Sequence, residues 1–161
     1  MNYFPVEQLK NAWVFKHKSL PIDELDLAKI KPMTEQRSNV LWDTFISRHN
    51  DHPDFFQKGD WPFDKSNWLE QGKWEGLWDS EEEGLPPLVA EHLNWDNNTV
   101  VYFCCERNLV IETTWLVFKQ HWKNFLFMDD GSILIGKKRS EAVQFNNTGY
   151  FKIGNKPSNN V

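Results

Sequence analysis

Cysteine is nearly absent from this chain of 161 residues, and its only two cysteines, Cys104 and Cys105, are adjacent. They lie in an apolar stretch typical of a β-strand, where neighbouring side chains point to opposite faces and are poorly placed for a structural disulfide. We interpret them as small packing residues in a reducing compartment. The sequence therefore predicts a cytoplasmic protein.

Long hydrophobic runs are also missing. The first residues lack the basic segment and following apolar segment of an export signal, and no apolar run approaches the roughly 18 residues that span a bilayer. We therefore expect a soluble, unexported protein with no membrane partner.

No motif of a known enzyme class is present. There is no Gly-x-Ser-x-Gly element, and Gly131 and Gly136 are not followed by the helix start and lysine of a phosphate-binding loop. A pairing of Cys104 with His92 or His121 stays open, as do paired carboxylates for glycoside cleavage. We predict no cofactor and favour a function other than catalysis.

Positive charge is scarce in one part of the chain. The net charge is −5, and residues 51–83 carry three basic and ten acidic side chains. A surface of this sign repels nucleic acid, and the one basic cluster, at residues 137–139, is too short to compensate. We therefore expect no nucleic-acid partner.

Tryptophan is abundant, with nine residues, four of them in a Trp-rich acidic segment at residues 57–87. Large rings can anchor a segment that has little regular backbone pairing. Rings interleaved with carboxylates also suit a protein interface or a carbohydrate groove. We expect most rings to anchor the segment and its acidic residues to form an outer, functional face. The predicted partner-binding residues are Trp61, Trp68, Trp74, Trp78, Asp79, Glu81, Glu82 and Glu83.

A second candidate site follows at residues 49–54. Two imidazoles and two carboxylates here could hold a hydrolytic metal, with His49, Asp51, His52 and Asp54 as ligands. The spacing is not His-Glu-x-x-His, and Pro53 interrupts a helix that would align the ligands. A polar helix end with histidines near its C-terminal dipole is the alternative interpretation.

The order of elements predicts an α+β protein. Apolar residues at helical spacing indicate helices in the first half, and β-branched and aromatic runs indicate strands in the second. Helices are expected at 23–31, 35–48 with Thr34 as N-cap, 86–94 and after Thr113 or Thr114, with short helical pieces at 66–71 and 74–80. Strands are expected within 12–21, in a hairpin over 98–112, and at 125–128, 132–136, 141–145 and 150–153.

We expect one α+β domain at residues 1–154, followed by a flexible tail at 155–161. Its N-terminal helices would pack on one face of a mostly antiparallel sheet of about five or six strands, built from the C-terminal half. The Trp-rich acidic segment would be irregular.

Four stretches together carry a family resemblance: LDLAKIKPM, LPPLVAEHLNWD, VIETTW and WKNFLFMDDGSILIGKK. With them the chain resembles a family of small uncharacterised proteins from marine and enteric gammaproteobacteria, a domain-of-unknown-function family. The resemblance implies a bacterial cytoplasmic protein and assigns no functional residue. The stretch FLFMDDGSILIG after helices is also similar to the Smi1/Knr4-like superfamily, whose members include toxin-immunity proteins.

These observations favour a non-enzymatic protein-binding module whose acidic, aromatic-rich segment engages a basic protein. A metal-dependent hydrolase that uses the His49 to His52 cluster and a saccharide-binding module are the alternatives. The sequence does not determine the oligomeric state.

Overall fold

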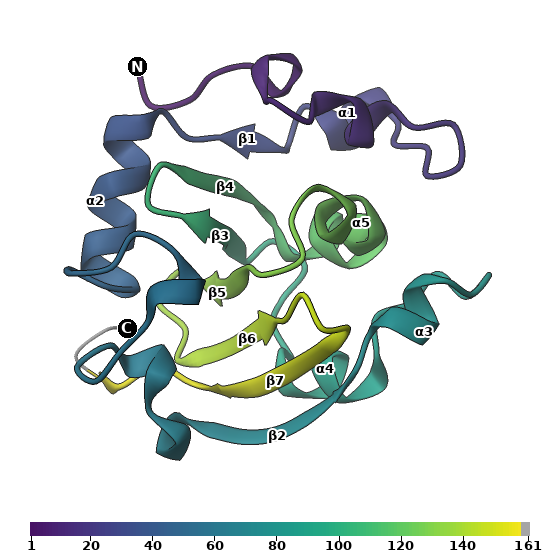
Figure 1. Cartoon of the computed structure of the whole chain (residues 1–161). Helices are drawn as coiled ribbons and strands as arrows, with labels where there is room; N and C mark the ends of the chain where they lie inside the picture. Colours follow the sequence, from purple (N-terminus) through teal and green to yellow (C-terminus); the bar gives the residue numbers. More distant parts are fainter. Residues whose placement is uncertain (159–161) are drawn as a thin grey trace.

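A computed structural model describes residues 1–158 and confirms the α+β class (Figure 1). Its strands form one antiparallel sheet in the order β1-β4-β3-β5-β6-β7-β2. The strands are β1 Lys31–Pro32, β2 Trp68–Lys73, β3 Val100–Glu106, β4 Leu109–Thr114, β5 Ile133–Gly136, β6 Glu141–Phe145 and β7 Tyr150–Asn155. The helices are α1 Glu24–Leu27, α2 Glu35–Phe45, α3 Glu75–Trp78, α4 Pro87–His92 and α5 Trp115–Met128, with short 3₁₀ turns at Val6–Gln8, Ala12–Lys16, Pro53–Phe55, Trp61–Phe63 and Lys65–Asn67. Within residues 1–158 no helix is both long enough and apolar enough to cross a membrane.

The predicted hairpin lies in the sheet between β1 and β5. β3 and β4 pair antiparallel across the turn at residues 107–108, because both strands are runs of β-branched and aromatic side chains. Cys104 and Cys105 lie on opposite faces, each in a different apolar core, and both are free. Burial raises the pKa of both thiols well above the ordinary value, so they remain protonated packing groups.

Helices cover both faces of the sheet, whereas we expected them on one. α2 packs Leu41 and Trp42 against the face that carries Tyr102 and Cys104, and α5 packs on the other face. Figure 1 shows these two helices on opposite sides of the strands. The sheet also has seven strands rather than five or six, because the N-terminal half contributes β1 and β2 to its two edges.

The strand predicted at residues 125–128 is wrong, because α5 continues through Met128. The apolar stripe that begins at Trp115 and Phe118 extends one further turn to Phe125. There its ring packs 5.2 Å from that of Phe103, centroid to centroid, in the core. The local sequence favours helix and strand about equally here, and packing of the Phe125 ring in the core selects the helix.

The helical piece predicted at residues 66–71 is also wrong, because β2 occupies residues 68–73. β2 pairs with β7 along the edge of the sheet, and its Gly72 lies against the ring of Phe151. The Trp-rich acidic segment is therefore partly regular, with β2 followed by α3.

Two smaller differences concern the ends of the chain. The strand expected within residues 12–21 is instead a 3₁₀ turn at Ala12–Lys16. Asn155, where we expected a flexible tail to begin, pairs with Glu141, and Lys156 is buried. Residues 159–161 lie outside the described part of the chain.

Candidate functional site

The four tryptophans of the Trp-rich acidic segment act as anchors. Trp61 and Trp74 are buried, and Trp68 and Trp78 are half-buried. Each indole N–H donates a hydrogen bond to a main-chain carbonyl: Trp61 to Phe45 at 2.8 Å, Trp68 to Pro62 at 2.9 Å, Trp74 to Asn146 at 3.1 Å and Trp78 to Lys123 at 2.9 Å. The ring of Trp68 also contacts that of Trp61 and lies under the amine of Lys152. A stacked sugar would have to compete with these contacts.

The acidic residues that follow these anchors line a groove of about 1030 Å³, which we call the acidic groove. Asp79, Glu81 and Glu83 form one wall together with Trp78. Glu82, which we grouped with them from the sequence, is exposed but does not line the groove. Along residues 78–84, Glu82 alone does not line the groove.

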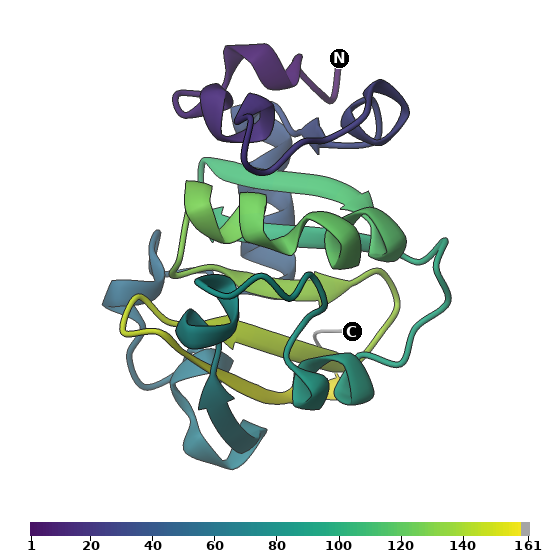
Figure 2. The same cartoon turned by 90° about the vertical axis from the view of Figure 1, so that its right-hand side faces the viewer.

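The floor of the acidic groove is α5, and the second wall is the N-terminal segment from His17 to Asp26. In Figure 2, α5 faces the viewer between this segment on one side and the segment around α3 on the other. The floor residues are Lys119, Gln120, His121, Lys123, Asn124 and Phe127. The helical backbone is interrupted at His121, whose φ of −127° and ψ of 22° mark a kink beneath the groove.

Hydrogen bonds from the floor hold both walls in place. Trp122 donates to the carbonyl of Glu83 and Lys123 donates to that of Ser80, both at 2.9 Å. On the other side the imidazole of His121 lies 2.8 Å from the Asp26 carboxylate. The acidic groove is therefore formed before any ligand binds, which lowers the entropic cost of binding.

Negative charge predominates along the acidic groove. Its five carboxylates are Asp23, Asp26, Asp79, Glu81 and Glu83, against the two lysines Lys119 and Lys123. Both amines are engaged, Lys119 with the Asn97 side chain at 2.8 Å and Lys123 with the Ser80 carbonyl. Across the described residues no ion pair neutralises Asp79, Glu81 or Glu83.

Two exposed aromatic rings meet at the acidic groove: Phe127, which lines it, and Trp13, which packs against Phe127. Phe127 is 38% exposed and Trp13 is 55% exposed, and their ring centroids are 5.1 Å apart. Trp78 packs edge-on to Phe127 at 5.6 Å. Large exposed rings beside unpaired carboxylates combine apolar contact area with charge, as the centre and rim of a protein interface do.

The predicted metal ligands do not converge. Asp51 pairs with Arg107 at 2.5 Å, and His52 accepts a hydrogen bond from the main-chain N–H of Asp54 at 3.0 Å. Among residues 1–158 no three His, Cys, Asp or Glu side chains are grouped closely enough to hold a metal ion. His52 therefore caps the N-terminus of the 3₁₀ turn Pro53–Phe55.

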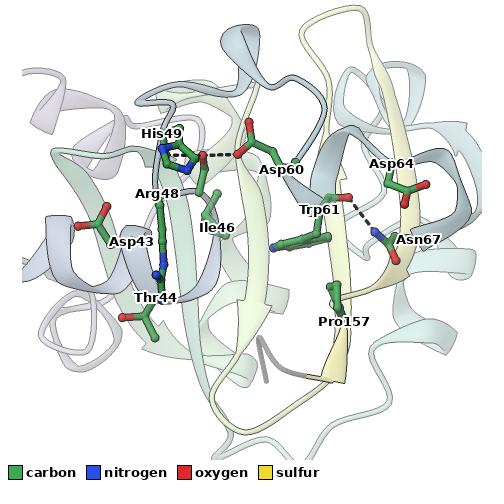
Figure 3. A pocket seen from close by; sticks show the side chains of 12 residues that line it. Asp43, Thr44, Ile46, Arg48, His49, Asp60, Trp61, Asp64, Asn67 and Pro157 are labelled. Carbon is green, nitrogen blue, oxygen red and sulfur yellow. Dashed lines mark hydrogen bonds between the residues drawn. The ribbon is translucent and has the colours of Figure 1, made fainter.

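His49 instead lines a second pocket, of about 660 Å³, at the end of α2 (Figure 3). This second pocket is also lined by the buried carboxylate of Asp60. That carboxylate accepts hydrogen bonds from Ser47 at 2.5 Å, Asn50 at 2.6 Å and the Gln57 N–H at 3.1 Å. Both oxygens of Asp60 are thus occupied in holding the loop. Nearby, two hydrogen bonds from Ser66, one from its N–H and one from its hydroxyl, lower the pKa of Asp64.

The family model for Protein of unknown function (DUF2947) matches residues 3–154. The chain belongs to the DUF2947 family. A search of curated proteins and a search of solved structures each gave no match. The DUF2947 match spans all residues that line the acidic groove, from His17 to Phe127. The similarity to the Smi1/Knr4-like superfamily remains a prediction.

Sequence reasoning found one wall of the acidic groove in this DUF2947 protein and missed the rest. The acidic run and Trp78 were visible as a local pattern. Asn124 and Phe127 were only helix or strand positions, and His121 was considered only as a partner of Cys104. Asp26 is 95 residues from His121 in sequence, so no local spacing indicates their contact.

Proposed function

We propose that this protein is a non-enzymatic protein-binding module that holds a basic segment of a partner protein in the acidic groove. The observation that supports the proposal most strongly is the row of unneutralised carboxylates at Asp79, Glu81 and Glu83 on a wall that internal hydrogen bonds hold in place. Charge complementarity then selects a cationic partner.

The two parts of the acidic groove have different roles in the proposed complex. Exposed carboxylates attract a basic partner over a distance and accelerate its encounter, but each contributes little to the final affinity. The exposed rings of Trp13 and Phe127 supply apolar area that is removed from water on binding. We therefore expect the partner segment to carry basic residues together with at least one apolar side chain.

The test compares two charge-reversed variants, a double one inside the groove and a single one on a neighbouring residue outside it. Glu81→Lys with Glu83→Lys reverses charge inside the groove, and Glu82→Lys reverses it on the neighbouring exposed residue outside. Each tagged chain is incubated with lysate of the source organism, and retained proteins are identified by mass spectrometry. The identified partner is then purified and titrated directly.

We expect a basic partner to be retained by the wild type and by Glu82→Lys and lost from the double variant. In titration, the double variant should bind at least tenfold more weakly, as expected for several unfavourable charge contacts. Equal affinity of all three chains for every retained partner, or the absence of any basic partner, would contradict the proposed function.

A further inference from the structure

We infer that the floor of the acidic groove, between Asp26, Asn124 and Phe127, is a subsite for one arginine side chain of the partner. This inference rests on the proposed function and specifies the chemistry of the bound segment. Three properties of the floor carry it: an amide oxygen with no protein donor, a half-used carboxylate and an exposed aromatic ring.

The unpaired acceptor is the side-chain oxygen of Asn124. This side chain is 2% exposed, and its NH₂ group donates to the carbonyls of Val14 at 3.0 Å and Leu20 at 2.9 Å. Because two carbonyl oxygens face the nitrogen, the orientation of the amide is fixed. Its Oδ1 accepts no hydrogen bond from any residue between 1 and 158, and Asn124 lines the groove.

Asn124 Oδ1 is not one of the fully buried side-chain atoms that lack a partner, so water in the groove reaches it. A ligand that supplies an N–H at this point replaces that water with a direct hydrogen bond. The floor of the acidic groove therefore favours a donor, and the surrounding charge favours a donor that is positively charged.

The carboxylate of Asp26 provides the second acceptor. One oxygen, Oδ2, contacts His121, and Oδ1 has no hydrogen-bond partner among the described residues. His121 and Asn124 are three residues apart on α5, the spacing that brings side chains together on one helix face. The contact with His121 thus places a carboxylate beside the stretch of floor that contains Asn124.

Phe127 provides the ring, three further residues along the same floor. Its edge-on contacts with Trp13 and Trp78 hold it in place, while more than a third of the residue remains exposed. Arginine presents a planar guanidinium with five N–H donors that stacks on aromatic rings, whereas lysine offers a compact ammonium. Two acceptors and a ring suit the guanidinium better than the ammonium.

The experiment titrates three small probes into the ¹⁵N-labelled full chain and follows backbone amide signals by NMR. The probes are the acetyl-amide derivatives of arginine, of lysine and of citrulline, which is uncharged and nearly isosteric with arginine. We expect the arginine probe to shift the signals of Asn124 and Phe127 and to bind several-fold more tightly than the lysine probe. The citrulline probe should produce the smallest shifts.

Two matched pairs of variants locate the subsite. Phe127→Leu keeps an apolar side chain but removes the ring, and Phe63→Leu makes the same change at an exposed phenylalanine that does not line the groove. We expect Phe127→Leu to weaken the arginine probe about two- to fivefold and Phe63→Leu to leave it unchanged. Asp26→Asn should weaken it as well, while Asp54→Asn, an exposed carboxylate that does not line the groove, should not.

Equal dissociation constants for the three probes, or shifts confined to residues outside the acidic groove, would overturn the arginine subsite. Equal effects of Phe127→Leu and Phe63→Leu on binding of the arginine probe would also overturn it. The proposed function is decided separately, because the Glu81 and Glu83 variants change the wall and leave Asp26, Asn124 and Phe127 intact. If those variants lose the partner but the three probes bind equally well, the acidic groove remains the partner-binding site and the arginine subsite is rejected.

Discussion

Lys156 is the most unusual single residue in the structure. It is 4% exposed and forms no ion pair among residues 1–158, and its amine lies 5.0 Å from the centre of the Phe45 ring. Burial lowers the pKa of Lys156 to about 8, since the charged form is poorly solvated there. This one side chain therefore makes stability depend on pH above about 8.

Lys156→Met should stabilise the protein at pH 7. The unfolded chain holds the Lys156 proton up to a pH of about 10.4, whereas the folded chain releases it near 8. Between these values the unfolded state binds more protons, so the free energy of unfolding of the wild type rises with pH. We expect a gain of about 1–3 kcal/mol for Lys156→Met at pH 7.

Urea denaturation of both chains at pH 7 and pH 10 measures this effect. The difference in unfolding free energy should shrink as pH rises, because the wild type gains stability that the methionine variant lacks. A difference that stays constant between the two pH values would contradict the assignment of the effect to Lys156.

At the scale of single residues, the sequence predicts interactions between residues that are close together in the chain. Thr34 was expected as an N-cap, as was either Thr113 or Thr114. Thr34 and Thr114 each accept a hydrogen bond from the main-chain N–H three residues on. Asn124 could not be predicted, since its partners Val14 and Leu20 are 110 and 104 residues away. A mid-helix asparagine gives no local sign that its amide joins the helix to the N-terminal segment.

At the scale of elements, the edge strand β2 shows where local propensity is insufficient. Its residues, Trp68 to Lys73, are mostly exposed and lack a clear alternation, so a short helix was an equal choice from the sequence. The strand exists because β7 is available to pair with it. The end of α5 shows the opposite case, where packing of Phe125 in the core extends a helix over residues that resemble a strand.

Gly154→Ala should weaken the attachment of β2. A Cβ at Gly154 would collide with the main-chain oxygen of Asn67 and come within 2.7 Å of the Trp68 ring, so β2 would have to shift. Overpacking of this kind costs about 1–3 kcal/mol. Gly76→Ala is the matched control, because nothing lies within 4 Å of a Cβ at that position.

Denaturant unfolding gives the stabilities, and hydrogen exchange shows where protection is lost. We expect Gly154→Ala to unfold at a lower urea concentration and to exchange faster in β2 and β7. Gly76→Ala should be neutral or slightly stabilising, since alanine restricts the unfolded chain. Equal effects of the two substitutions would indicate that Gly154 is not in the close contact described.

At the scale of the whole molecule, the class of fold was predictable and the placement of elements was not. The second half alternates turn residues with β-branched runs, which indicates the antiparallel hairpins that the structure shows. Which face each helix covers depends on apolar contacts between distant segments, such as Trp42 of α2 with one core and Trp122 of α5 with the other. The acidic groove exists only because that placement brings three segments together.

The uneven distribution of charge predicts that partner binding depends on salt. Attraction between exposed charges is screened within about 10 Å at 0.1 M salt and 3 Å at 1 M. The association rate of the identified partner with the wild type should therefore fall about tenfold between 0.05 M and 0.5 M NaCl.

Stopped-flow or surface-binding kinetics at several salt concentrations give this rate. The variant with Glu81→Lys and Glu83→Lys should show a much flatter dependence, and Glu82→Lys a nearly unchanged one. A wild-type rate that does not change with salt would show that the acidic groove does not steer its partner.

The order of strands in the sheet has a consequence for biosynthesis. β1 and β2 are translated before the five strands that lie between them in the sheet, and the partner of β2, β7, is translated last of all. A nascent chain therefore carries β2, with its exposed Leu69, as an unpaired strand throughout translation of the segment up to β7. Glu70 and Lys73 place charges on this strand, a feature that discourages pairing between chains. Translation, rather than the finished fold, is thus the stage at which this protein is most exposed to aggregation.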